Sequence, residues 1–213
     1  MAYLKRIGVA CFNFLLKMSL AIESDGINKE LARRIAQRGS NSLGWFTPDE
    51  AAVTEALARI IVPSDEETPG LEEVCVLDEP AIVRLDKLVE ASSYRQQAYA
   101  YGLLAFDRWA LSEHGRRFVE LTKEDQAALF RTAQQMYEGW AGDVPAIRKA
   151  WRRLRAIMQT RKGLFFAGQL YPQIRSDCLQ VFYTSRVSWV WLEYDGPPME
   201  KGYPSVTTPR EQC

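Results

Sequence analysis

The chain has 213 residues, enough to bury one sizeable hydrophobic core, and 47% of them are hydrophobic, as in ordinary globular proteins. Lysine plus arginine and aspartate plus glutamate both number 27, so the formal net charge at pH 7 is zero. A neutral chain lacks the positive field with which nucleic-acid and anionic-membrane binders attract their targets, and we expect neither target here.

Bound metal and cofactor are not expected either. The cysteines are far apart, at Cys11, Cys75, Cys178 and Cys213, and the chain has a single histidine. Structural zinc sites use four ligands at short paired spacings, which are missing. No Gly-x-Gly-x-x-Gly turn for a dinucleotide follows a strand pattern. The sequence therefore predicts that this chain itself holds no cofactor.

Residues 1–43 are predicted to form an N-terminal helical arm. Its apolar residues repeat at helical spacing, which indicates an amphipathic helix: Leu4, Ile7, Cys11, Leu15, Met18 and Ile22. Phe12 makes part of the opposite face apolar as well, so we expect a partner to cover some of this helix. The apolar run is too short to span a bilayer, and we expect no transmembrane segment.

The clearest helix start lies at the beginning of the next segment. Thr47 is a natural N-cap, Pro48 suits the first helical position, and Glu50 completes a capping box. Phe46 before the cap is placed to pack back onto the helix, which Pro63 ends. The acidic residues 64–76 that follow lack the Asp-x-Asp-x-Asp-Gly spacing of a calcium loop, and we expect a solvated loop.

Helical periodicity continues through the rest of the core. We expect a helix over 79–91 capped by Asp78, one over 94–113 ending at His114, and one opened by Thr122 that runs to Gly139. Residues 145–162 are expected to form a basic helix whose charged face is either solvated or docked on an acidic protein surface. Phe165, Phe166, Leu170 and Tyr171 are expected to be helical and buried, ahead of residues 173–183.

Residues 189–213 differ, because aromatic residues there are mixed with glycine and proline. Proline and glycine exclude regular helix past Tyr194, so we predict an extended tail. Such an arm covers either this chain's own body or the surface of a partner. The fold class is thus all-α, a single irregular helical domain divided into the N-terminal arm (1–43), a helical core (44–188) and the tail (189–213).

Two landmarks carry a family resemblance. The first is residues 46–65, from Phe-Thr-Pro-Asp-Glu to Val-Pro-Ser-Asp, and the second is residues 182–204, from Phe-Tyr-Thr-Ser to Gly-Tyr-Pro. Together they resemble the gluconate 2-dehydrogenase subunit 3 family, the small subunits of flavin-dependent sugar and polyol dehydrogenases. The middle of the chain is similar too, so the resemblance covers about 44–204. Glu193 departs from it, because relatives usually have glycine there.

The resemblance implies an all-helical, non-catalytic subunit that binds a large flavoprotein of the glucose–methanol–choline (GMC) type and helps it fold. The FAD would belong to that partner, and a cytochrome c subunit is a further candidate partner. We expect the two apolar ends of the chain to form the interface through Ile7, Cys11, Phe12, Met18, Trp189, Trp191, Tyr194, Pro197, Pro198 and Tyr203.

Family members commonly begin with a twin-arginine export signal, which Lys5 and Arg6 do not form. The chain's own sequence therefore favours the cytoplasm, and a periplasmic location would require export within the complex. Two other function classes stay open. One is an independent enzyme, for which Asp107, Glu113 and Glu193 are weak acid–base candidates. The other is a stand-alone helical interaction protein.

Overall fold

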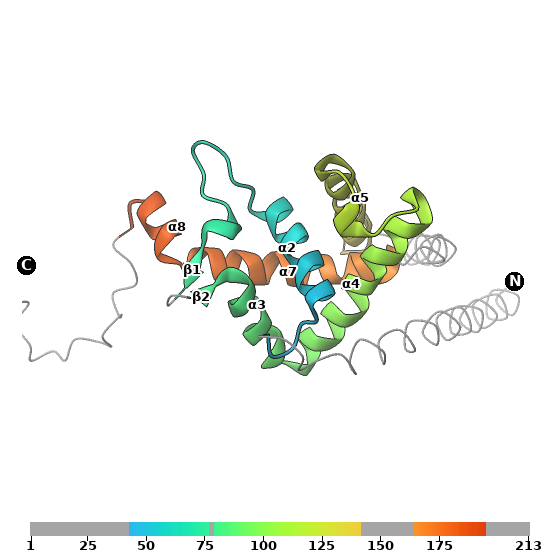
Figure 1. The fold of residues 1–213 in the computed structure, drawn as a ribbon, viewed down its shortest axis with the longest axis horizontal. Helices are drawn as coiled ribbons and strands as arrows, with labels where there is room; N and C mark the ends of the chain where they lie inside the picture. The colour runs from blue at the N-terminus through green and yellow to red at the C-terminus, as the bar shows by residue number, and fades with distance from the viewer. Residues whose placement is uncertain (1–42, 77–78, 142–163, 195–213) are drawn as a thin grey trace, which may run out of the picture.

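The computed structural model describes residues 43–76, 79–141 and 164–194, and these are predominantly α-helical, which confirms the predicted fold class. Figure 1 shows α7 (Leu164–Tyr183) running along the molecule, with the other long helices packed against it. These are α2 (Pro48–Ile61), α3 (Ala81–Glu90), α4 (Ser93–His114) and α5 (Lys123–Ala141). The short elements are η1 (Leu71–Glu73), η2 (Phe118–Glu120), β1 (Cys75–Val76), β2 (Glu79–Pro80) and α8 (Arg186–Trp191).

The start of α2 has the predicted capping box. The Thr47 hydroxyl accepts the N–H of Glu50 at 3.2 Å, and the Glu50 carboxylate accepts the N–H of Thr47 at 2.9 Å. The chain just before the cap is held from α3, where the buried Asp86 carboxylate accepts the N–H groups of Trp45 at 3.0 Å and Phe46 at 2.6 Å. One carboxylate thus fixes how the chain enters α2.

The predicted start of the next helix is wrong by two residues. Helix α3 begins at Ala81 rather than at residue 79, because Glu79 pairs with Val76 in the antiparallel β1–β2 ladder. The residue before a proline is disfavoured in the α region, so Pro80 helps to keep Glu79 extended. Asp78, the predicted cap, lies outside the described residues.

The later helices extend further than predicted. Helix α5 continues to Ala141 rather than ending at Gly139, and α7 is continuous through Pro172. Leu170 and Tyr171 are buried as predicted, whereas Phe166 is only half-buried. The predicted N-terminal arm and the basic helix over 145–162 lie outside the described residues.

Helices α4 and α7 approach closely at one glycine. A Cβ atom on Gly102 would lie 2.4 Å from the Cβ atom of Leu170, so only a residue without a side chain permits this spacing. A polar group locks the same pair of helices. The fully buried carboxylate of Asp177 on α7 accepts from Arg95 Nε at 3.1 Å and from the Tyr99 hydroxyl at 3.1 Å, both on α4.

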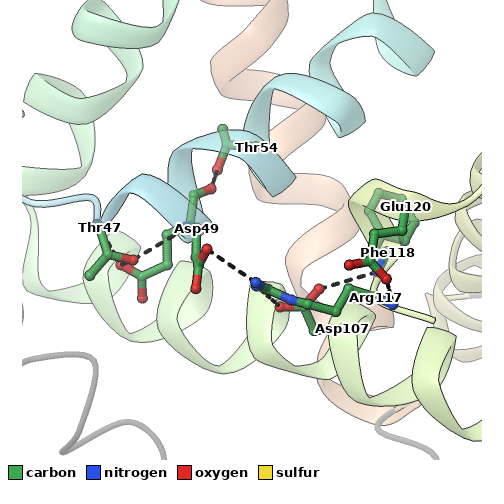
Figure 2. Close-up of polar contacts among 8 residues, drawn as sticks. Thr47, Asp49, Thr54, Asp107, Arg117, Phe118 and Glu120 are labelled. Atoms are coloured by element: carbon green, nitrogen blue, oxygen red, sulfur yellow. Dashed lines mark hydrogen bonds and ion pairs between the residues drawn. The ribbon is translucent and has the colours of Figure 1, made fainter. Parts of the chain in front are cut away.

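An arginine ties the loop after α4 to two helices. Figure 2 shows Arg117 between Asp49 in the first turn of α2 and Asp107 on α4. One terminal guanidinium nitrogen lies 3.1 Å from Asp49 Oδ1 and the other lies 3.1 Å from Asp107 Oδ2. Asp107 also accepts the N–H of Phe118 at 3.3 Å, which fixes η2 against α4. Because the Asp107 side chain is almost fully buried, it needs this cation and this donor to offset its desolvation.

The end of the described chain is a short helix rather than an extended tail. Ser185 is the N-cap of α8 and accepts the N–H of Ser188 at 3.2 Å, while the Ser188 hydroxyl donates to the Phe182 carbonyl at 2.6 Å. Trp189 and Trp191 are therefore helical, and the extended tail predicted from residue 189 starts too early.

A Schellman motif ends α8. The N–H of Tyr194 donates to the Trp189 carbonyl at 2.8 Å, and the N–H of Glu193 donates to the Val190 carbonyl at 3.1 Å. Glu193 has a φ of 53°, the left-handed conformation that glycine adopts without strain. The sequence resemblance leads us to expect glycine at this position, and the backbone here has the conformation that favours glycine.

We expect Gly102→Ala to destabilise the fold. Alanine gains about 1 kcal/mol in helix propensity, but the contact with Leu170 forces α4 and α7 apart, so we expect a net loss of about 2 kcal/mol in the free energy of unfolding. Urea denaturation measures this loss. The double variant Gly102→Ala/Leu170→Ala is the control, because the shorter side chain at position 170 frees room for the new methyl group. Its free energy of unfolding should fall by less than the sum of the decreases in the two single variants. A single variant as stable as wild type would contradict the close approach.

We expect Glu193→Gly to stabilise the end of α8 by about 1 kcal/mol, because glycine removes the left-handed strain. Hydrogen exchange at residues 193 and 194 should slow by about fivefold, since those N–H groups donate the two motif bonds. Glu193→Ala is the matched control. It removes the same charge but keeps a Cβ atom, and equal protection in both variants would show that charge rather than backbone strain is responsible.

Candidate functional site

The described part of the chain gathers most of its large exposed apolar side chains around α8. We call this surface the terminal patch, and it consists of Tyr183, Val190, Trp191, Leu192 and Tyr194. Val190 is 72% exposed and Trp191 is 42% exposed, so a large part of each apolar side chain meets solvent. Figure 1 shows α8 at one end of the described part of the molecule. A cluster of large exposed apolar side chains is typical of protein interaction sites.

The patch is anchored to the core beneath it. The ring of Trp191 lies edge-on to the buried Phe182, with centroids 6.1 Å apart, and Trp189 donates its indole N–H to the Tyr183 carbonyl at 2.7 Å. The Trp189 and Tyr194 rings meet at right angles, 6.4 Å apart. These contacts hold the exposed faces in one arrangement, so little side-chain freedom remains to be lost on binding.

The structure divides the predicted interface residues into three groups. Trp191 and Tyr194 are exposed, as an interface requires, whereas Trp189 is half-buried and supports the patch from below. The other predicted residues lie outside the described part of the chain: Ile7, Cys11, Phe12, Met18, Pro197, Pro198 and Tyr203.

Sequence reasoning missed Tyr183, Val190 and Leu192. The Ser-x-x-Ser spacing of Ser185 and Ser188 is a helix N-cap pattern, and a helix started there would have placed these side chains beside the aromatic residues.

The carboxylates considered for catalysis do not form one site. Asp107 is neutralised by Arg117, and Glu113 lies near the C-terminal end of α4. Glu193 follows α8 at the other end of the molecule (Figure 1). His114 is exposed, and the cap after it is Gly115, in the left-handed conformation at a φ of 69°.

The described residues form no recognisable binding site for a metal ion or a dinucleotide. Within these ranges no group of three or more His, Cys, Asp or Glu side chains is placed to hold a metal ion. Strands β1 and β2 have two residues each, and no glycine-rich turn follows either in the described chain. Of the helices in the described ranges, none has the length and apolar character needed to cross a membrane.

Comparison with known proteins assigns the family. The model of the family described as gluconate 2-dehydrogenase subunit 3 matches residues 48–196, from the first residue of α2 to just beyond the Schellman motif that ends α8. No curated protein and no solved structure matches the chain. Since the matched region covers most of the chain and includes the terminal patch, this protein belongs to the gluconate 2-dehydrogenase subunit 3 family.

Proposed function

We propose that the chain is a non-catalytic accessory subunit that binds and stabilises the large, FAD-dependent GMC-type subunit of a sugar or polyol dehydrogenase. Membership of the family supports the role of a dehydrogenase subunit. The terminal patch is the observation that carries the binding role, because it is apolar, aromatic and ordered without being covered by the described chain. The flavin and the oxidation of the substrate belong to the partner.

The composition of the patch suits a protein surface better than a small molecule. Tryptophan and tyrosine are enriched among the residues that dominate binding energy at protein interfaces, because each buries a large area with few rotatable bonds. Trp191 and Tyr194 project from a helix end rather than into an enclosed cavity, whereas small-molecule sites are concave. A complementary hollow would therefore lie on the large subunit.

An independent enzyme is the weaker proposal. Acid–base catalysis needs two groups within reach of one substrate, but Asp107 lies on α4 and is already paired to Arg117, whereas Glu193 follows α8. The arrangement of the described residues favours a binding subunit over a catalyst.

We expect variants of the terminal patch to weaken the complex without unfolding the subunit. Trp191→Ala should raise the Kd for the GMC-type flavoprotein encoded nearest the gene by about thirtyfold, the effect of losing a hot spot of about 2 kcal/mol. Leu192→Ser should also raise the Kd. Its matched control is Leu111→Ser, since the two leucines are 47% and 49% exposed and Leu111 lies on α4.

Co-expression and titration of the purified subunits measure these changes, and thermal melting confirms that each variant is folded. Equal Kd values for the two leucine variants would contradict the proposed interface. Flavin absorbance together with sugar oxidation by the isolated chain would contradict the non-catalytic role.

A further inference from the structure

A groove of about 170 Å³ lies between α2, η1 and the start of α3. Its walls include the buried side chains of Ala58, Leu71 and Leu85 and the half-buried Ile82. Dry apolar cavities of about 150 Å³ bind a benzene ring, so this groove is large enough for one aliphatic or aromatic side chain. Its apolar walls favour such an occupant over a polar one.

The rim of the groove is acidic on balance, because the carboxylates of Glu55 and Glu72 outnumber the one guanidinium there, that of Arg59. Glu55 carries an exposed carboxylate with no hydrogen bond or ion pair among the described residues. Glu72 forms a weak, solvent-exposed ion pair, in which its Oε2 atom lies 3.9 Å from Arg59 Nε. Exposed pairs of this kind leave most of each charge available to a partner. The segment 64–76 that contributes the rim has several acidic residues and no lysine or arginine. The rim therefore favours an apolar side chain that is flanked by a cation.

The groove adjoins the terminal patch through the β1–β2 hairpin. Strand β1 contacts α8 on one side, and β1 and β2 contact α3 on the other. Figure 1 shows the hairpin between α8 and α3. Cys75 on β1 is exposed at this junction. A protein surface that covers the terminal patch can therefore continue over the hairpin to the groove.

We infer that the large dehydrogenase subunit extends its contact from the terminal patch across the hairpin and inserts one apolar side chain, flanked by lysine or arginine, into this groove. The inference rests on the proposed function and adds a second anchor to it. A second copy of this chain is a poor occupant, because its own acidic rim would face the rim around Glu55.

The first test is a thiol footprint on the complex. Burial raises the pKa of the Cys178 thiol, which keeps it protonated and unreactive, whereas Cys75 is exposed. In a Cys11→Ser/Cys213→Ser background, iodoacetamide should modify Cys75 at least about tenfold more slowly when the large subunit is bound. An unchanged rate in the complex would overturn the inference that the contact crosses the hairpin.

The second test reverses the charge at the rim. Glu55→Lys should raise the Kd for the large subunit by about tenfold at low ionic strength, and the effect should shrink as salt is added. Glu124→Lys on α5 is the matched control, an exposed glutamate outside the groove, and it should leave the Kd unchanged. Ala58→Leu, which narrows the groove, should raise the Kd by a similar factor if its melting temperature is preserved.

The outcomes separate this inference from the proposed function. If the wild-type chain does not bind the flavoprotein, the proposed function fails and the second anchor fails with it. If the wild-type chain binds but Cys75 keeps its full reactivity, or Glu55→Lys and Glu124→Lys give the same Kd, only the groove contact is overturned. Slower modification of Cys75 in the complex, together with a higher Kd for Glu55→Lys but not for Glu124→Lys, supports the groove contact.

Discussion

The contact between α4 and α7 is the constraint on which the rest of the structure depends. Helix α7 also packs against α2, α3, α5 and α8, so the position of α4 on α7 sets the frame for all of them. Gly102 lets the two backbones approach. The buried Asp177 carboxylate on α7 fixes the position of α4 along α7, because it accepts hydrogen bonds from Arg95 and Tyr99 on α4 in one alignment of the two helices. A slip would remove both donors on α4 and leave the buried charge with the Gln173 amide of its own helix, at a cost of several kcal/mol.

The sequence predicts the elements whose causes are local. The capping box of Thr47 and Glu50 involves residues three apart, and the apolar repeat of α4 lies within one helix. Helical periodicity misses two kinds of contact. The start of α3 depends on the strand pairing of Glu79 with Val76, which is local but which apolar spacing does not reveal. Asp177 receives its donors from Arg95 and Tyr99, 82 and 78 positions earlier, and no local pattern contains those contacts.

The candidate interface was only partly predictable for a similar reason. Its aromatic residues stand out in the sequence, but whether each is exposed depends on how α8 packs on α7. Trp189 turns toward the Tyr183 carbonyl and supports the surface, while Val190, with no feature to distinguish it in the sequence, is its most exposed member. The buried Phe182 ring beneath Trp191 links this surface to the core, so the patch keeps its shape without a partner.

In the proposed complex, the terminal patch and the groove have different physical roles. An aromatic patch gains free energy from any apolar surface that covers it, so by itself it discriminates poorly among partners. The groove adds a requirement of shape and of charge. A partner that covers the groove removes water from the Glu55 carboxylate, and an apolar side chain without a neighbouring cation would supply no new charge to offset that loss. Since the chain has no net charge to steer association over long distances, selectivity has to come from such short-range contacts. The hairpin joins the two surfaces, so a single rigid partner that engages both also fixes the orientation of the subunit.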